Sequence, residues 1–250
     1  MAGMSRGTLV SDTAMVMAAG LGKRMLPLTA NTPKPLIKVG GKALIDYMIE
    51  HLADAGLERA VVNVHYLPDQ IEAYLSGREH PEFVFSDERE ELLETGGGMI
   101  KAWRAGLLPD PFFCLNSDNI WIDGPRNTLL DLSDMWDPER MDALLLVVPK
   151  ERAFQHRGKG DFHLDPDGRL RRRGPDEDSA PTIYIGAQIV SHRLLRDAPE
   201  GPFSTMVLWE RAIAEGRLFG VEHQGEWFDM GTPEAIAPAE AHLAELSAGG

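Results

Sequence analysis

Cysteine and long hydrophobic runs are both scarce in this sequence. Cys114 is the single cysteine among 250 residues, which excludes an intrachain disulfide and fits a reducing compartment. No uninterrupted apolar run approaches the roughly 20 residues that span a bilayer. Residues 1–13 are too polar to form the hydrophobic core of a signal peptide. These absences predict a soluble, cytoplasmic protein that does not enter a membrane.

Positive charge is also in short supply. The chain has 25 Lys and Arg against 39 Asp and Glu, so its formal net charge is −14. A surface of that sign disfavours general binding to nucleic acid or to an anionic membrane. An acidic protein that binds phosphates must therefore gather its cations at one place or recruit a metal ion. The length suits one sizeable domain, which we place at residues 14–250 behind a flexible N-terminal tail of residues 1–13.

The most informative stretch is residues 15–41. A short apolar run stops at a glycine-bearing turn, residues 20–22, and the cations Lys23 and Arg24 follow directly. Lys34 comes later, between two prolines that restrict the local backbone. Glycine lets backbone N–H groups approach a polyanion, and Arg and Lys supply the charge that phosphate oxygens need. The stretch favours a phosphate site, although a bare G-x-G also fits a plain strand–turn connection with solvated cations.

Two common phosphate motifs do not match this stretch. The third glycine of the dinucleotide-binding G-x-G-x-x-G pattern is missing, because Met25 stands in its place. The spacing of a P-loop is absent as well. A dinucleotide-binding oxidoreductase is therefore disfavoured.

Strand-like and helix-like segments alternate through the first 150 residues. The apolar, strand-like segments lie at 14–19, 60–64, 83–85, 112–116 and 143–148. The amphipathic, helix-like segments lie at 43–55, 68–75 and 98–105. Continuous apolar strands separated by helices indicate a parallel sheet that is covered on both faces.

The pattern changes after residue 150. Short alternating segments at 161–164 and 170–173 flank a D-P-D-G turn and predict an antiparallel hairpin. Further segments predict strands at 182–190 and 218–222, a helix at 203–215 and a final helix from Pro233, with Thr232 as its N-cap. We expect an α/β fold: a single doubly wound, mostly parallel, Rossmann-like sheet with a small antiparallel lobe in the second half. Ligands of such sheets bind beyond the carboxyl ends of the strands.

Two aspartates follow apolar runs in different parts of the chain. Asp118 ends a strand in L-N-S-D-N, and Asp229 lies in W-F-D-M-G-T. Carboxylates on two strands can form an oxygen-ligand site for Mg²⁺, which takes few protein carboxylates and completes its shell with phosphates and water. Each aspartate alone also fits a turn or a helix N-cap. The histidines His156, His163 and His192 lack the mutual spacing of metal ligands, and no role is assigned to them.

Two further segments carry candidate ligand-binding groups. The run E-T-G-G-G at residues 94–98 opens a predicted helix, and it is either a second anion or sugar-hydroxyl site or a flexible turn. Asn63, at the end of a predicted strand, has an amide that can hydrogen-bond to a nucleobase.

The first stretch resembles a known family when it is taken as a whole. The segments A-A-G-L-G-K-R-M-L-P-L-T and P-K-P-L-I-K-V-G-G-K-A-L are similar to the motifs of the sugar-1-phosphate nucleotidyltransferases. Three positions differ from the usual pattern: Lys23 replaces Thr or Ser, Ala43 replaces Pro, and Ser117 replaces the Gly before Asp118. The form L-E-T-G-G-G resembles a narrower branch, the N-acetylmuramate-1-phosphate uridylyltransferases of bacterial cell-wall recycling. The likeness covers most of residues 14–245.

The resemblance implies a role for each matching residue. Residues 14–150 form the nucleotide half and residues 151–250 the sugar-side half, which includes the antiparallel lobe. The implied catalytic residues are Arg24, Lys34, Asp118 and Asp229, and the two aspartates bind the catalytic Mg²⁺. The implied nucleotide-binding residues are Ala18, Ala19, Gly20, Gly22, Lys23, Asn63 and Gly97. The implied sugar-binding residues are Glu94, Thr95, Gly96, Asn116, Gly160, Tyr184 and Gly186.

The expected reaction is transfer of a nucleotidyl group from an NTP, UTP by preference, to a sugar-1-phosphate such as N-acetylmuramate-1-phosphate, with release of pyrophosphate. One alternative is a mannose-1-phosphate guanylyltransferase or another member of the family, because selectivity lies in loops. A second is a catalytically silent nucleotide-sugar sensor, which has no need of two metal-binding carboxylates. The expected partners are these two substrates, and the expected assembly is a monomer or a homodimer.

Overall fold

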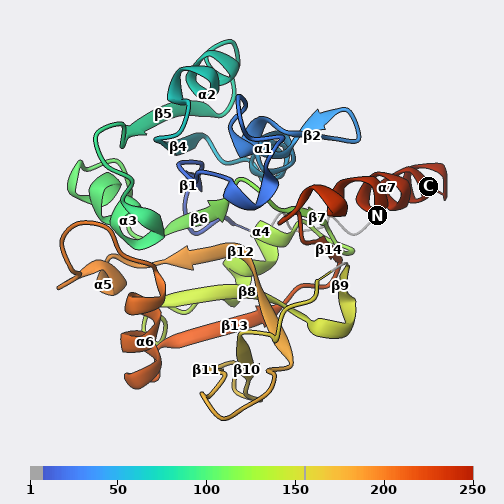
Figure 1. Cartoon of the computed structure of the whole chain (residues 1–250). Coiled ribbons are helices and arrows are strands. Elements are labelled where there is room, and N and C mark those ends of the chain that lie inside the picture. The colour runs from blue at the N-terminus through green and yellow to red at the C-terminus, as the bar shows by residue number, and fades with distance from the viewer. Residues whose placement is uncertain (1–7, 155, 250) are drawn as a thin grey trace, which may run out of the picture.

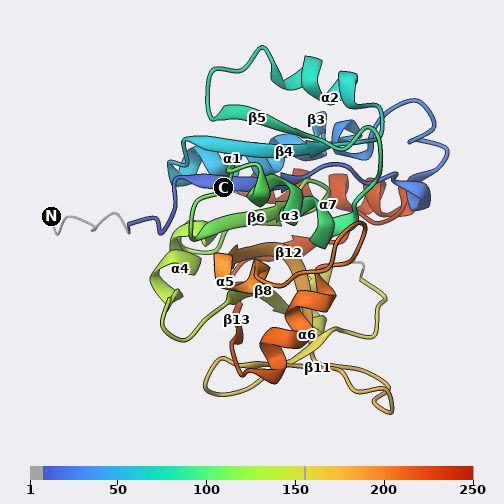
Figure 2. The ribbon, with the colours of Figure 1, turned by 90° about the vertical axis from the view of Figure 1, so that its left-hand side faces the viewer.

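The computed structural model describes residues 8–154 and 156–249, which form one large sheet with helices on both faces (Figure 1). The strand order is β11-β10-β12-β6-β1-β4-β5, and β8 and β13 extend the sheet from β12. In the centre, β1 (Thr13–Met17) is parallel to β4 (Arg59–Val64) and to β6 (Phe112–Asn116). The strand β5 (Glu82–Asp87) is parallel to β4 and ends this side of the sheet. Figure 2 shows the strands of the sheet one above another, from β5 near the top down to β13.

The second half of the chain adds strands of both directions. The long strand β12 (Thr182–Val190) is antiparallel to β6 and to β8 (Ala143–Pro149). The strand β13 (Leu218–Glu222) is parallel to β8. The hairpin of β10 (Phe162–Leu164) and β11 (Leu170–Arg172) is antiparallel, which confirms the predicted lobe.

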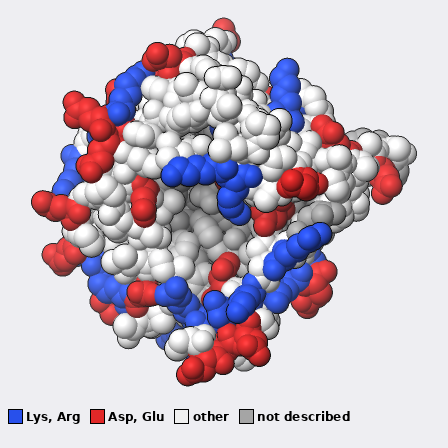
Figure 3. All heavy atoms as spheres, in the orientation of Figure 1, with Lys and Arg blue, Asp and Glu red and all other residues white. Residues whose placement is uncertain are grey.

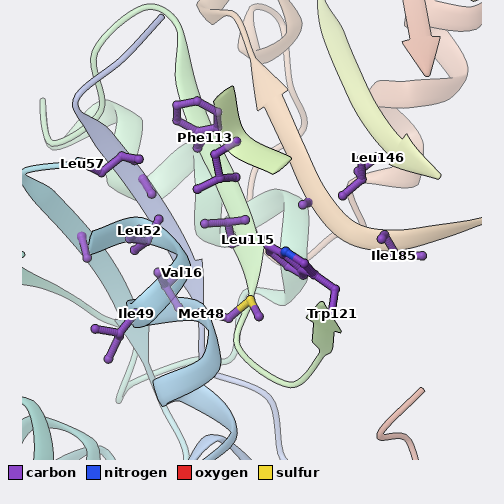
Figure 4. Packing of buried hydrophobic residues seen from close by; sticks show 14 of the residues in the cluster. Val16, Met48, Ile49, Leu52, Leu57, Phe113, Leu115, Trp121, Leu146 and Ile185 are labelled. Carbon is purple, nitrogen blue, oxygen red and sulfur yellow. The ribbon is translucent and has the colours of Figure 1, made fainter. Parts of the chain in front are cut away.

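Successive side chains along the strands of the large sheet point to opposite faces, and they pack into two separate hydrophobic cores. Ala14 and Val16 of β1 face the cluster beneath α1 (Leu44–Ala55), α2 (Pro68–Leu75) and α4 (Thr128–Met135). Met15 faces the opposite cluster beneath α3 (Glu94–Arg104), α5 (His192–Leu195) and α6 (Met206–Ala214). This alternation is what a strand buried on both faces requires. The doubly wound architecture is confirmed, and Figure 4 shows Met48, Leu115 and Trp121, which all belong to the first core.

Short elements escaped the sequence-based prediction. A second, three-stranded sheet contains β7 (Ile120–Ile122), β9 (Ala153–Phe154) and β14 (Glu226–Phe228). A third, two-stranded sheet joins β2 (Lys38–Val39) to β3 (Lys42–Ala43). Strands of two or three residues have no measurable hydrophobic period, so only their pairing partners reveal them. The helix α4 was also missed, although Asn127 is a true N-cap that accepts hydrogen bonds from the backbone N–H groups of Leu129 and Leu130.

The C-terminal helix starts differently from the prediction. Pro233 opens a 3₁₀ turn, η4 (Pro233–Ala235), before α7 (Ile236–Gly249) continues. Thr232 occupies the N-cap position with an extended backbone, but its side chain makes no capping hydrogen bond. The described residues contain three more 3₁₀ turns: η1 (Lys23–Met25), η2 (Lys34–Leu36) and η3 (Lys150–Arg152).

The folded part of the chain begins earlier than residue 14. Residues 1–7 of the predicted tail lie outside the described residues. Leu9 and Val10 pack against the first core, and Thr13 already belongs to β1. The carbonyl of Asp12 accepts hydrogen bonds from the amides of Glu58 and Arg59, which explains why the polar segment is held in place. Within the described ranges, the helices are all too short or too polar to cross a membrane.

Candidate active site

A cavity of about 590 Å³ opens at the carboxyl ends of β1 and β6, where the fold predicts a ligand. Figure 3 shows a hollow on this face of the molecule, with Lys and Arg side chains above and below it. The walls come from four segments: residues 17–25, residues 34–35, residues 92–95 without Leu93, and residues 116–118. Single residues from elsewhere complete it, namely Asn63, Ser204 and Gly231.

The loop after β1 forms the first wall of the cavity. Ala18, Ala19, Gly20, Gly22 and Lys23, which the resemblance implies bind the nucleotide, all line it. Gly22 has a φ of +60°, and an added Cβ would lie 2.9 Å from Thr29 Cγ2 and 3.1 Å from Lys34 Cβ. Only glycine combines this backbone conformation with such a close approach.

An ion pair between a buried lysine and a half-buried aspartate lies at the base of the cavity. Lys34 Nζ is 2.6 Å from Asp118 Oδ2, and the Lys34 residue is only 8% exposed. Lys34 stands at the start of η2 after Pro33, and Asp118 follows the end of β6. Ser117, which replaces a glycine of the family pattern, donates both its N–H and its Oγ–H to the carbonyl of Met17. The hydroxyl therefore ties the end of β6 to the end of β1, directly beside Asp118.

Asp229 reaches the same region from the end of β14. His156 Nδ1 donates to Asp229 Oδ2 at 2.8 Å. An added Cβ at Gly231 would lie 2.9 Å from both Arg24 Nη1 and Asp229 Oδ1, so these two groups share one side of Gly231. The hydrogen bond from His156, together with the charges of Arg24 and Lys34, holds the pKa of Asp229 below its ordinary value although burial raises it. The structure thus brings together all four of the implied catalytic residues.

The two carboxylates fit a magnesium ion better than a transition metal. Among the residues that the structure describes, no group of three or more His, Cys, Asp and Glu side chains could hold a metal ion. Asp118 accepts a hydrogen bond on Oδ2 from Lys34, and Asp229 accepts one on Oδ2 from His156. Carboxylate oxygens are the ligands of a hard cation that takes most of its shell from phosphates and water.

The residues of the E-T-G-G-G run, at the start of α3, lie in two different environments. Glu94 and Thr95 line the cavity. Gly96 and Gly97 do not, and their amides donate instead to the carbonyl of Phe203. An added Cβ at Gly96 would lie 2.3 Å from the Phe203 ring, and one at Gly97 would lie 2.6 Å from the carbonyl of Gly201. These two glycines allow the segment before α6 to pack on α3, and the sequence offered no sign of that neighbour.

The implied sugar-binding residues of the second half pack against other parts of the fold. Asn116 lines the cavity, and an added Cβ at Gly186 would lie 3.0 Å from its Nδ2. Tyr184 packs edge-on against Trp209 with ring centroids 4.8 Å apart, and burial raises the pKa of its hydroxyl. Gly160, with a φ of +79°, lies against the carbonyl of Ala180 in the hairpin lobe. Tyr184, Gly160 and Gly186 are not among the residues that line the cavity. Direct sugar contacts by these three residues remain predictions.

Several residues of the site had no role in the sequence-based prediction. His156 holds Asp229, but its position before G-K-G carries no spacing that would reveal a carboxylate 73 residues away. Ser204 and Leu92 line the cavity from loops. Gly231 was inside the W-F-D-M-G-T motif, which was the one available signal.

Comparisons with known proteins show which family this chain is similar to. The family described as nucleotidyl transferase matches residues 13–155. The chain is 46% identical to the N-acetylmuramate alpha-1-phosphate uridylyltransferase of Caulobacter vibrioides over 93% of its own length and 97% of that protein. It is 32% identical to the enzyme of that name from Neisseria meningitidis, over 91% and 96% of the two chains. A crystal structure of UDP-glucose pyrophosphorylase with UDP-glucose has the same fold, with a TM-score of 0.75 at 16% identity, covering 94% of this chain and 99% of that one.

Proposed function

The chain belongs to the nucleotidyl transferase family, and from that premise we propose that it transfers the uridylyl group of UTP to N-acetylmuramate-1-phosphate. The products are the UDP-sugar and pyrophosphate. The observation that carries the proposal is the convergence of Lys34, Asp118 and Arg24 at one cavity of an acidic protein, with Asp229 beside Arg24 at Gly231. The high identity to uridylyltransferases that act on N-acetylmuramate-1-phosphate supports the choice of substrates.

Catalysis of this reaction requires that the two substrates are positioned and that the charge of their phosphates is neutralised. The attacking oxygen of a sugar-1-phosphate is already an anion, so the site needs no general base. Rate enhancement then comes from orienting the two substrates and from groups that stabilise charge in the transition state. A cavity with several cations can orient the two substrates, and a nearly buried lysine can stabilise the charge of the transition state.

The cations of the site divide between the two ends of the triphosphate. Lys23 and Arg24 are exposed at the cavity wall, where they bind the β- and γ-phosphates. Lys34 is held by Asp118 at the base, where it stabilises charge on the α-phosphate as the pyrophosphate leaves. The backbone of the loop from Ala18 to Gly22 admits the nucleotide closely.

Asp118 and Asp229 would hold Mg²⁺, which supplies Lewis-acid charge and a template for the phosphates. We expect that chelation with EDTA lowers the rate of pyrophosphate release at least about 100-fold, and that added Mg²⁺ restores it. Matched samples titrated with Ca²⁺ or Zn²⁺ test whether the hard, octahedral ion is needed. Full activity in EDTA would contradict the assignment of the two aspartates.

Glu94, Thr95 and Asn116 line the cavity and are the proposed contacts to sugar hydroxyls.

A cytoplasmic enzyme with this activity would act in the recycling of cell-wall sugars, as a monomer or a homodimer. The scarcity of cysteine supports the reducing compartment.

The decisive experiment is pyrophosphate release from a panel of four NTPs against N-acetylmuramate-, N-acetylglucosamine-, mannose- and glucose-1-phosphate. We expect turnover with UTP and the muramate substrate, and rates at least about tenfold lower for the other pairs. Turnover with GTP and mannose-1-phosphate would keep the mechanism and replace the substrates. Nucleotide binding without turnover of any pair would favour the silent sensor.

A further inference from the structure

Glu88 is a buried carboxylate that is not part of the catalytic set. It follows β5 directly, it is 0% exposed, and its amide donates to the carbonyl of Val64. Both of its carboxylate oxygens are used: Oε1 accepts from Asn63 Nδ2 at 2.8 Å, and Oε2 accepts from the Leu93 amide at 3.2 Å. Within residues 8–154 and 156–249 no Lys, Arg or His forms an ion pair with it.

Asn63 extends this contact to the phosphate-facing loop. Its Oδ1 accepts a hydrogen bond of 2.8 Å from the Ala18 amide, and its side chain is nearly as buried as that of Glu88. Ala18 is the first residue after β1, and it lines the cavity. Leu93, at the other end, lies between Leu92 and Glu94, which line the cavity from the α3 side. A continuous chain of hydrogen bonds therefore joins two walls of the cavity through Asn63 and Glu88.

The direction of these hydrogen bonds requires a carboxylate. The Ala18 amide is a donor, so the carbonyl of Asn63 must face it and the NH₂ group must face Glu88. The Leu93 amide is a second donor. An ionised Glu accepts from both donors, whereas a protonated Glu would add an O–H donor to a site whose two partners are already donors. Burial raises the pKa of Glu88, and the hydrogen bonds from Asn63 and Leu93 oppose this. A buried charge without an ion pair lowers the stability of the folded state, so stability does not explain its presence.

We propose that Glu88 is a positioning residue for nucleotide binding, which sets the Ala18 loop through Asn63 and the loop before α3 through the Leu93 amide. The inference rests on the proposed function, because the nucleotide lies in the cavity that both loops line. Gly98 marks how closely the pair is enclosed: an added Cβ there would lie 2.8 Å from Glu88 Oε1 and 3.0 Å from Asn63 Nδ2.

A swap of the two side chains tests the proposal. Glu88→Gln places a side-chain NH₂ group against either the Asn63 NH₂ group or the Leu93 amide, both of which are donors. Asn63→Asp places a second carboxylate against the carboxylate of Glu88. In the double variant, the carboxylate at position 63 accepts from the Ala18 amide and from the side-chain NH₂ group at position 88, whose carbonyl accepts from the Leu93 amide. Every hydrogen bond is restored with one carboxylate in total. We expect each single change to weaken UTP binding, measured by calorimetry with Mg²⁺, at least about tenfold, and the double variant to bind within about threefold of the wild type.

A matched control separates positioning from general stability. Asp142 is a buried carboxylate outside the cavity lining, which accepts from Nε of Arg193 and Nε of Arg217. Asp142→Asn should lower the melting temperature without changing the dissociation constant of UTP. Glu88→Gln and Asn63→Asp variants that melt early but bind UTP normally would overturn the proposal, as would a folded double variant that does not recover binding.

Gly98→Ala gives a second, independent perturbation if the swapped pair does not fold. Alanine favours a helix over glycine, so a role in helix stability alone predicts a higher melting temperature and unchanged binding. Displacement of the pair predicts weaker UTP binding, and normal binding in this variant would count against the proposal. Wild-type protein that binds UTP without turning over the muramate substrate would refute the proposed function only, because the swap is measured by binding.

Discussion

The Lys34–Asp118 pair shows how a single residue acquires its chemistry from its surroundings. The lysine is nearly buried, and its ammonium lies 2.6 Å from the Asp118 carboxylate. Gly22 also packs closely against it, because a Cβ added at Gly22 would lie 3.1 Å from Lys34 Cβ. This enclosure keeps the ammonium in one place, where it costs no reorganisation when charge develops on a phosphate.

Replacing Lys34 by Ala should lower kcat more than it raises KM for UTP. We expect kcat to fall on the order of 100- to 1,000-fold and KM to change less than about tenfold, since the contact tightens in the transition state. Steady-state pyrophosphate release measures both constants. Lys42→Ala is a matched control, because Lys42 pairs with Glu50 at the surface of α1, and its kinetics should equal those of the wild type. A change confined to KM would contradict the role of Lys34.

The contacts between elements depend on polar groups as well as on the two cores. Asp123, just after β7, accepts hydrogen bonds from Trp121 Nε1 and from the hydroxyl and amide of Thr128 at the start of α4. Its other oxygen lies 3.5 Å from His51 of α1, whose ring stacks on Trp121. One carboxylate thus connects β7 with two helices. Burial raises the pKa of Asp123, but hydrogen bonds from His51 and Thr128 outweigh it and bring this pKa to about 2.

This junction gives the free energy of unfolding a defined pH dependence. The pKa is lower in the folded state, so the stabilisation is complete above the ordinary value of about 4 and is lost as the pH falls toward 2. We expect Asp123→Asn to reduce the free energy of unfolding by about 2 kcal/mol at pH 7, and by about half of that at pH 3. Urea unfolding at both values provides the measurement.

The control for the Asp123 variant lies on α4, the helix whose first residue, Thr128, donates to Asp123. Asp134 of α4 is exposed and pairs with Arg126, so Asp134→Asn should change the free energy of unfolding by less than about 0.5 kcal/mol at either pH. An Asp123→Asn effect of equal size at pH 7 and pH 3 would mean that the hydrogen bonds do not distinguish the ionised form.

At the scale of the whole molecule, the sheet and the cavity both cross the middle of the chain. β12 from the second half pairs with β6 from the first, and β13 pairs with β8. The cavity likewise combines the loop after β1 with Ser204 and Gly231. The nucleotide half and the sugar-side half share one sheet, and we expect them to unfold together.

Unfolding in urea should therefore be a single transition that a nucleotide shifts as a whole. Nucleotide at about 100 times its dissociation constant should raise the free energy of unfolding by about 2.7 kcal/mol, because it binds only the folded state. Far-ultraviolet circular dichroism and tryptophan fluorescence should give the same midpoint as each other, both with and without UTP. Two transitions, of which UTP shifts only one, would show that the halves are separate units.

The sequence by itself determined the elements and the chemistry that are local. Apolar runs and helical spacing predicted β6, α2 and β12 with their observed bounds, because hydrophobic period and flanking prolines act within a few residues. The glycine turn with its cations, and the two aspartates at strand ends, were also evident, and their family resemblance predicted the activity that we propose.

Only the tertiary structure decided which groups meet across long separations. His156 and Asp229 are 73 positions apart, Asn63 and Glu88 are 25 apart, and Gly96 meets Phe203 from another segment of the chain. No local period encodes such contacts, because they depend on how strands are ordered in the sheet and on which loops then share one edge. For the same reason Gly96 and Gly97, predicted to bind ligand, lie in a helix-packing contact, whereas Asp118 lines the cavity and Asp229 lies beside the cavity residues Arg24 and Gly231.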